Sequence, residues 1–184
     1  HAEDCASALV RLADVEGAAS FLSSCSLAIV AQRLVRKVCP TCAEVHVPPP
    51  ETVEALHIHS FDPDVVDFRL GAGCSDCFGT GYRGRTGIFE MMVVEPEMRT
   101  MLLERLSARE IRHHLFENPQ FISLKHAGFL KAVQGVTTLD EIIRVLPAFE
   151  LEAPETRNVT LDEISRRAGL ASRGRLERLD DDMV

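Results

Sequence analysis

In the stretches Cys39-Pro-Thr-Cys42 and Cys74-Ser-Asp-Cys77, two cysteine pairs of the same spacing stand on either side of residues 43–73. A gap of two residues lets both sulfurs of a pair reach one ion from a tight turn, and two such pairs are typical of a structural zinc site. Free thiols or two disulfides are the alternative, but the repeated spacing and the lack of a recognisable secretory signal argue against it. We therefore predict one Zn²⁺ held by Cys39, Cys42, Cys74 and Cys77.

The residues after the second pair are consistent with a metal-binding turn. Gly79, Gly81 and Gly84 follow it at short intervals. Glycine adopts positive φ angles readily and allows close backbone approach, which lets amide groups turn toward the sulfurs. Four thiolates around Zn²⁺ carry a net charge of about −2, so we expect Arg83 and Arg85 to offset it, the alternative being that they are ordinary solvated charges.

The composition limits the class of protein. The chain has 184 residues, 46% of them hydrophobic, and a formal net charge of −8. This fits a globular protein with one moderate core and a small additional module. The negative charge argues against a general nucleic-acid or anionic-membrane binder. The longest apolar stretch, residues 27–38, contains Gln32, Arg33, Arg36 and Lys37, so no segment is suited to span a membrane, and we expect a cytoplasmic protein.

Hydrophobic spacing and capping residues indicate an α+β chain that is mainly helical. A helix is predicted over residues 2–15 and a second over residues 20–38, which would deliver Cys39 at its carboxyl end. The later expected elements are a helix over 51–56, strands over 66–70 and 86–94, and helices that begin at Pro96, at Ser107, near Leu124 and at Thr138. Ser107 and Thr138 are each followed three residues later by a glutamate, which is the spacing of a capping box. The main domain should finish near Leu146-Pro147.

Three strings, in this order, resemble the carboxyl-terminal third of the type II secretion and type IV pilus-assembly ATPases. They are AQRLVRKVCPTC (residues 31–42), GCSDCFGTGYRGRTGIFE (73–90) and HAGFLKAVQGVTTLDEIIR (126–144). The resemblance covers about residues 1–146 and implies the carboxyl-terminal part of a RecA-like P-loop ATPase domain with an inserted zinc-binding module. It divides the chain into the end of the ATPase core (1–38), the tetracysteine module (39–85), a strand with a helical bundle (86–146) and an appended tail, partly helical or disordered (147–184).

The resemblance also implies roles for residues near the amino end. The start HAEDCA (residues 1–6) is similar to the family's His box, in which the histidine lies near the nucleotide phosphates. His1 is therefore a candidate catalytic residue, and Arg11 a candidate nucleotide contact. A P-loop ends in Gly-Lys-Ser/Thr, and no lysine of this chain follows a glycine. We expect the Walker A, Asp-box and Walker B segments to lie upstream, and the chain alone not to hydrolyse ATP.

For the parent protein, the resemblance implies a homo-hexamer that binds ATP and Mg²⁺ in the cytoplasm and sits at the inner membrane through its partners. Turnover of ATP would move its domains and drive the addition of pilin-like subunits through a membrane platform protein, while zinc stiffens the module. The expected partners are that platform and the cytoplasmic domains of the secretion or pilus machinery, and no nucleic acid is expected. The residues do not distinguish secretion from pilus assembly.

Two other classes of protein share parts of the pattern. The string CSDCFGTG (residues 74–81) matches the zinc-region repeat of J-domain chaperones, which carry four such repeats. Residues 160–175 resemble the start of a DNA-binding helix-turn-helix, but the segment is short and is followed by acidic residues that would repel phosphate. The insert's histidines are alternative metal ligands, although four thiolates make surface positions the default for them: His46, His57 and His59.

Overall fold

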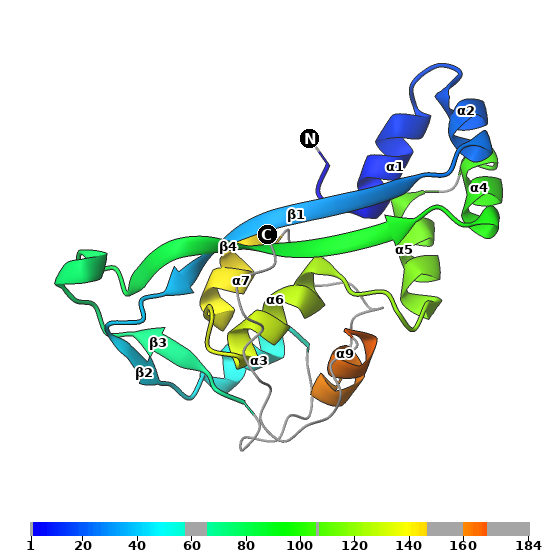
Figure 1. The fold of residues 1–184 in the computed structure, drawn as a ribbon. Coiled ribbons are helices and arrows are strands. Elements are labelled where there is room, and N and C mark those ends of the chain that lie inside the picture. Colours follow the sequence, from blue (N-terminus) through cyan, green and yellow to red (C-terminus); the bar gives the residue numbers. More distant parts are fainter. Residues whose placement is uncertain (1, 58–65, 106, 147–159, 169–184) are drawn as a thin grey trace.

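The computed structural model describes residues 2–57, 66–105, 107–146 and 160–168 (Figure 1). It contains both helices and strands, which confirms the predicted α+β class. Its elements are α1 (Cys5–Ala13), α2 (Ala18–Ser24), β1 (Ala28–Val38), β2 (Ala43–Val45), α3 (Pro50–Ala55), β3 (Arg69–Gly71), the 3₁₀ turn η1 (Ser75–Cys77), β4 (Tyr82–Val93), α4 (Pro96–Leu103), α5 (Ala108–Glu117), α6 (Leu124–Val133), α7 (Leu139–Val145) and α9 (Leu161–Arg167).

A long antiparallel ribbon of β1 and β4 runs through the molecule (Figure 1). Its register pairs Ala28 with Val93 at one end and Arg36 with Arg85 near the other. Alternate side chains lie on opposite faces of a strand. The inner face is buried, whereas on the outer face Val30 is 59% exposed and several other apolar side chains are half exposed. The ribbon therefore has one covered face and one apolar face that the described residues leave open.

The predicted helix over residues 20–38 is wrong. The structure has the short helix α2, then β1 from Ala28. Along β1 the burial alternates with a period of two until Val35, as expected for a strand with one face in the core. Over a stretch this short, the apolar residues fit both the helical period of about 3.6 residues and the strand period of two. Pairing with β4, which is rich in β-branched and aromatic residues at Thr86, Ile88 and Phe89, selects the strand.

Most of the other predicted elements are present with adjusted ends. The predicted strand over 86–94 is β4 and begins earlier, at Tyr82. The predicted strand over 66–70 is reduced to β3, which begins at Arg69 and pairs with β2. The predicted helices correspond to α1, α3, α4, α5, α6 and α7. No helix within the described ranges has both the length and the apolar character that crossing a membrane requires.

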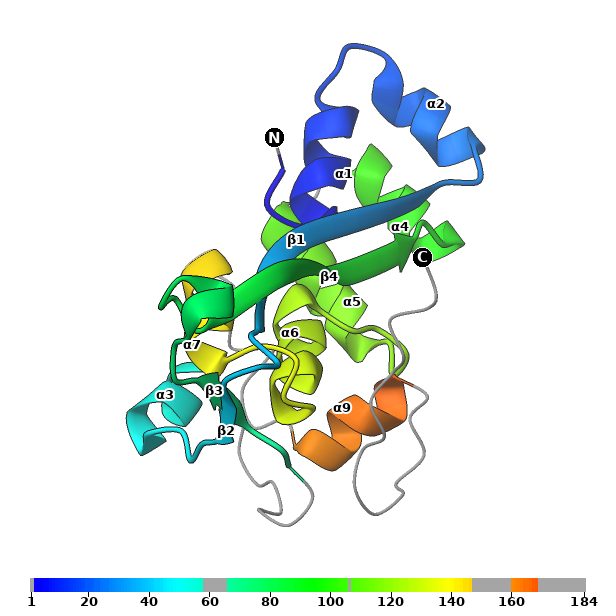
Figure 2. The ribbon, with the colours of Figure 1, turned by 60° about the vertical axis from the view of Figure 1, so that its left-hand side comes forward.

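Two apolar clusters cover the inner face of the ribbon. The first joins the ribbon to α6, α7 and α9 and includes Val35, Ile88 and Phe129. Both ribbon views draw α6, α7 and α9 on the same side of the ribbon (Figures 1 and 2). The second cluster joins the other end of the ribbon to α1, α4 and α5 and includes Leu9 and Met92. Each half of the ribbon is thus held by its own set of helices.

The buried carboxylate of Glu90 connects these two halves. Its Oε1 accepts a hydrogen bond from the Cys5 N–H at 3.0 Å, and its Oε2 accepts one from the Leu124 N–H at 3.3 Å. Cys5 and Leu124 are the first residues of α1 and α6, whose N–H groups have no partner within their own helix. Burial raises the pKa of Glu90. One side chain of β4 therefore fixes the start of two helices.

A second buried carboxylate, Glu141, fixes α7 to β1. Its Oε1 accepts from the Arg36 N–H at 3.0 Å, and Arg36 Nη2 donates to Oε2 at 2.7 Å. Arg144 donates to both carboxylate oxygens at 2.6 and 2.7 Å. Ser107 and Glu110 form the expected capping box, but at α7 only Thr138 caps the helix, because the Glu141 side chain binds the arginines instead.

The tail contributes a helix to the core. Thr160 caps α9 by accepting a hydrogen bond from the Glu163 N–H at 3.2 Å. Leu161 and Ile164 are buried in the first apolar cluster, with Ile164 fully inaccessible. The part of the tail that resembles the second half of a helix-turn-helix lies outside the described residues.

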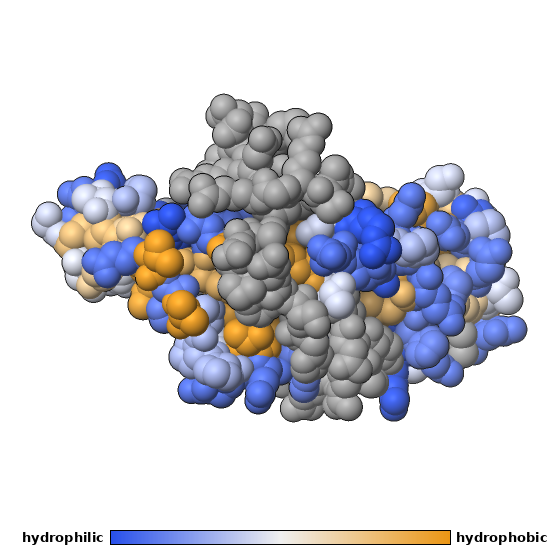
Figure 3. Space-filling model, turned by 90° about the horizontal axis from the view of Figure 1, so that it is seen from below, coloured by the Kyte–Doolittle hydropathy of each residue, from blue (hydrophilic) through white to orange (hydrophobic). Residues whose placement is uncertain are grey.

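Hydrophobic side chains also occur on the surface. On the face drawn in Figure 3 they form separate patches among hydrophilic residues. Near the cysteine turns, Val45 and Val47 are 73% and 83% exposed, and Phe78 is 92% exposed. These exposed side chains lie outside both clusters, whereas Leu56 and Phe68, in the middle of the insert, are buried in the first cluster.

Candidate metal centre

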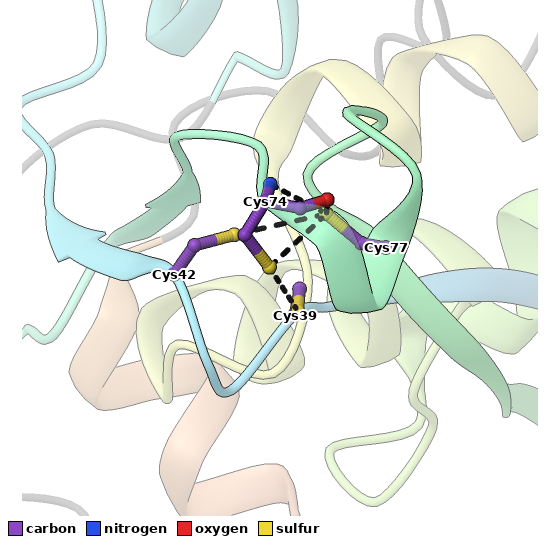
Figure 4. Close-up of side chains that lie close together, drawn as sticks. All are labelled: Cys39, Cys42, Cys74 and Cys77. Atoms are coloured by element: carbon purple, nitrogen blue, oxygen red, sulfur yellow. Dashed lines mark hydrogen bonds between the residues drawn. The ribbon is translucent and has the colours of Figure 1, made fainter.

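The four predicted cysteine ligands converge at the end of the ribbon (Figure 4). Their sulfur atoms all lie within 4.8 Å of one another. The Sγ–Sγ distances are 3.9 Å for Cys39 and Cys74, 3.8 Å for Cys42 and Cys77, and 3.7 Å for Cys74 and Cys77. A tetrahedral ion with metal–sulfur bonds of about 2.3 Å places its ligands about 3.8 Å apart. The four sulfurs therefore fit the tetrahedral coordination of a single Zn²⁺.

The backbone on either side of the cysteines explains why they meet. Cys39 directly follows β1 and donates its N–H to the Gly81 carbonyl at 2.9 Å, which joins it to the start of β4. Cys42 directly precedes β2, and its carbonyl accepts from the Ala72 N–H at 2.9 Å, just beyond β3. Each cysteine of the first pair is therefore bonded to the chain beside the second pair.

Backbone amides surround the sulfurs, as the glycine-rich sequence predicts. The Gly73 N–H donates to Cys42 Sγ at 3.3 Å, and the N–H groups of Cys74 and Gly81 donate to Cys77 Sγ at 3.2 and 3.3 Å. The hydrogen bond from Cys74, with that from Gly81, lowers the pKa of Cys77 to about 6. Burial raises the pKa of Cys42 to about 12. Two backbone N–H donors at the Cys77 sulfur favour the thiolate form that binds a metal.

Close backbone contact is required beside the cluster. A Cβ at Gly71 would lie 2.1 Å from the Gly81 carbonyl oxygen, and one at Gly81 would lie 2.5 Å from the Gly71 oxygen. Gly81 also has a φ of 75°, in the left-handed region that favours glycine. The chain after β3 and the chain before β4 can cross at this distance only because both residues are glycine.

Arg83 has an acidic partner beside the cluster. Arg83 Nη1 lies 3.7 Å from Asp76 Oδ2, and the same carboxylate oxygen accepts from the Thr41 hydroxyl at 2.9 Å. Arg83 therefore interacts with Asp76, an acidic residue that lies between the second pair of cysteines. Arg85 is exposed and lies opposite Arg36 in the ribbon register. The structure thus shows an acidic partner for Arg83 that the sequence reasoning did not assign.

The histidines of the insert are outside the cluster where the structure describes them. Within the described ranges, the group that could hold a metal consists of four cysteines alone. His46 is a neighbour of β2 and bonds to the Phe68 carbonyl through its backbone N–H at 2.9 Å. His57 follows α3, and His59 lies outside the described residues. The predicted ligand set therefore needs no replacement by a histidine.

Of the two candidate nucleotide-site residues, the structure places only Arg11. It lies exposed in the last turn of α1. His1 lies outside the described residues. The helix that follows it is firmly anchored, because the buried Asp4 caps α1 through the Ser7 N–H at 2.8 Å and forms an ion pair with Arg112 of α5. The roles of His1 and Arg11 in nucleotide binding remain predictions.

The sequence reasoning missed three buried carboxylates that join distant elements of the fold. Asp4, Glu90 and Glu141 each bond to a residue more than 80 positions away. The spacing of Thr138 and Glu141 predicted that Glu141 helps to cap a helix. That spacing does not indicate the bonds between Glu141 and Arg36. A charged residue within an apolar strand, such as Glu90 between Ile88 and Met92, is the signal that could have indicated burial.

Comparison with known proteins supplies the family context. The family model described as type II/IV secretion system protein matches residues 1–144. The type IV pilus assembly ATPase PilB of Thermus thermophilus is 37% identical over 144 residues, which cover 78% of this chain and 16% of the relative. The type II secretion system protein E of Pseudomonas aeruginosa is 35% identical over 146 residues, 79% of this chain and 28% of the relative. The putative type II secretion system protein E of Escherichia coli is 36% identical over 149 residues, which cover 80% of this chain and 29% of the relative. The chain spans less than a third of the length of these relatives.

Proposed function

Because the chain belongs to the type II/IV secretion system protein family, we propose that it is the carboxyl-terminal part of a motor ATPase that powers type II secretion or type IV pilus assembly. The observation that carries the proposal is the convergence of Cys39, Cys42, Cys74 and Cys77 within a segment that the family model covers. In this proposal the four thiolates hold one structural zinc ion. The residues 39–85 then form a metal-stapled module inserted into the ATPase domain.

The proposed role of zinc is to keep this module rigid. Its strands β2 and β3 have three residues each, and several of its apolar side chains are exposed. Leu56 and Phe68 hold the middle of the module in the first cluster, whereas the chain near the cysteines exposes Val45, Val47 and Phe78. Metal binding therefore supplies much of the folding free energy of the two cysteine turns. The metal has no open coordination position for a substrate, because four cysteines fill a tetrahedral shell.

We further propose that the remainder of a RecA-like nucleotide domain packs on the outer face of the ribbon. Val30, Leu34 and Phe89 on that face are 59%, 52% and 50% exposed. Exposed apolar patches of this kind commonly mark interaction surfaces. In the parent protein, the Walker A, Asp-box and Walker B segments belong to that remainder. His1 lies near the nucleotide phosphates, with Arg11 as a second contact.

The assembly proposed for the parent follows from its family. Its subunits form a homo-hexamer in the cytoplasm, at the inner membrane face, and bind ATP with Mg²⁺. Their partners are the membrane platform and the cytoplasmic domains of the secretion or pilus machinery. The bonds of Glu90 and Glu141 support a mechanical role, because they join the helices to the ribbon so that the piece moves as a unit.

The two other classes receive less support from the structure. A J-domain type of chaperone region carries four repeats, whereas the described residues form one four-cysteine cluster. The helix α9, at the start of the segment that resembles a helix-turn-helix, buries Leu161 and Ile164 in the core. That packing favours a structural role for α9 over contact with DNA.

The motor proposal is tested by ATP hydrolysis. The complete gene product should hydrolyse ATP with Mg²⁺, whereas the 184-residue chain should not. Replacing His1 with Ala in the complete product should lower the rate, and the His113→Ala variant, which alters an exposed histidine of α5 that is not proposed to contact nucleotide, should retain it. A complete product that binds zinc but does not hydrolyse ATP would contradict the motor proposal and leave the zinc proposal intact.

A further inference from the structure

A hollow lies at the end of β4 that is farthest from the cysteine cluster. It has a volume of about 440 Å³ and is formed by the end of β4, the first turn of α4, and the carboxyl end of α5 with the loop that follows. Its apolar lining includes Met91, Met92, Met98 and Phe121. Methionine side chains are flexible and polarisable, which suits a surface that adapts to a partner. The lining therefore accepts apolar side chains without demanding one shape.

The backbone beside the hollow is an open strand edge. The Val94 N–H donates to the Leu27 carbonyl at 2.9 Å, so at Val94, and by alternation at Met92, the backbone groups point toward β1. The N–H and C=O groups of Met91 and Val93 consequently point away from β1. Within the described part of the chain, no strand pairs with that edge of β4. Two residues that line the hollow thus present free donors and acceptors to it.

The rim of the hollow is acidic. Glu95 and Glu117 line it, and the described lining contains neither lysine nor arginine. His114 is the one lining side chain that gains positive charge on protonation, and its Nδ1 lies 3.6 Å from Glu117 Oε2. The carboxyl end of the ten-residue helix α5 faces the same space and adds partial negative charge through its last carbonyl groups. The site therefore favours a positively charged occupant.

We propose that this groove binds an extended segment of a partner protein in which apolar residues alternate with lysine or arginine. The segment adds to the open edge of β4 as a further strand, and its backbone pairs with Met91 and Val93. Its apolar side chains enter the methionine-lined hollow, while its basic side chains face Glu95 and Glu117. This assigns the groove a role that does not depend on the zinc site or on ATP hydrolysis.

Methionine methyl groups offer a direct readout, because the chain has five methionines. Nuclear magnetic resonance of the full 184-residue chain, labelled at these methyl groups, follows titration with a ten-residue peptide of alternating lysine and valine. The signals of Met91, Met92 and Met98 should shift, and that of Met101 should not. A glutamate–valine peptide should produce no shift, and a lysine–valine peptide with every amide N-methylated should fail to bind because it cannot pair as a strand.

Matched variants test the charge requirement. The double substitution Glu95→Lys with Glu117→Lys should weaken binding of the lysine–valine peptide about tenfold or more, since two attractions become repulsions. The control pair Glu54→Lys with Glu104→Lys makes the same change in net charge at exposed positions outside the lining and should bind normally. An unshifted Met101 signal reports that the variants are folded.

Several outcomes would overturn the proposal. These are equal binding of the acidic or the N-methylated peptide, a shift of the Met101 signal as large as those of the three lining methionines, or no shift of the three lining methionines at millimolar peptide. If the chain associates with itself through the groove, and the double substitution does not prevent this, the open edge of β4 belongs to a second copy of the chain instead. If the 184-residue chain binds the peptide and the complete gene product does not, the groove belongs to another segment of the same protein.

Discussion

Replacement of Glu141 with Gln should destabilise the fold by about 2 kcal/mol at neutral pH. The Glu141 side chain is fully buried and bonds to Arg36 and Arg144. Burial alone would raise its pKa, but the bonds from Arg144 and Arg36 lower the pKa from 4.5 to about 2. A pKa lowered from 4.5 to about 2 corresponds to roughly 3 kcal/mol of preference for the ionised carboxylate in the folded state. The arginine side chains are 41% and 57% exposed, so solvent screening reduces this to about 2 kcal/mol.

The pH dependence of the same variant gives a sharper test. Because the folded pKa of Glu141 lies below the unfolded value, the ionised carboxylate stabilises the fold above about pH 4.5, and this stabilisation is lost as the pH falls toward 2. The free energy of unfolding, measured by urea denaturation of both proteins, should therefore differ by about 2 kcal/mol at pH 7 and by progressively less below pH 4.5. Release of a metal at low pH is common to both proteins and cancels in the difference.

A matched substitution separates this effect from the general loss of a carboxylate. Glu163 pairs with Arg166 and Arg167 on α9, but its side chain is 30% exposed. Glu163→Gln should cost less than about 1 kcal/mol, as exposed ion pairs usually do. If Glu141→Gln costs no more than this control at pH 7, or if its effect is independent of pH, the assignment of Glu141 as the bond between α7 and β1 is refuted.

The other predictions concern His126 and Gly81. Burial, with the charges of Lys125 and Arg167, lowers the pKa of His126 to about 3, so the fold is stabilised above the unfolded pKa of about 6.5 and loses that stability as the pH falls toward 3. Between pH 8 and pH 5, the free energy of unfolding of the wild type should fall by about 2 kcal/mol more than that of His126→Leu. If urea denaturation gives the same change with pH for both proteins, this prediction is contradicted. Gly81→Ala should release zinc more readily in a chelator competition, because its Cβ would clash with the Gly71 oxygen at 2.5 Å. Gly84, near the start of β4, has nearly the same φ, 76°, but open space around it, so Gly84→Ala should retain zinc like the wild type; equal zinc loss from both variants would show that backbone strain and not close approach controls the site.

The metal site was predictable because its signal is local. The Cys-x-x-Cys spacing sets each chelating turn within four residues, and Gly81, one of the glycines that follow, donates its N–H to a sulfur. Helix starts were predictable for the same reason, as at Ser107, where the cap and its glutamate partner are three residues apart. Features that form within a few consecutive residues can therefore be predicted from the sequence.

The features that the sequence did not reveal depend on distant partners. The stretch that forms β1 fits a helix or a strand, and only its pairing with β4, more than 50 residues later, decides between them. Arg36 and Glu141 are 105 residues apart in the chain, so their bond cannot be seen in either local pattern. The same holds for α9, whose packing on the first cluster depends on a surface built from several elements.

The central claim is that one tetrahedral zinc ion joins the two cysteine pairs. X-ray absorption spectroscopy with metal analysis on the freshly purified chain tests it most directly. The account predicts one zinc per chain with four sulfur ligands at about 2.3 Å, and loss of that zinc in the Cys39→Ser and Cys74→Ser variants but not in Cys25→Ser. A chain without bound metal, a shell with fewer than four sulfurs, or two metals per chain would contradict it.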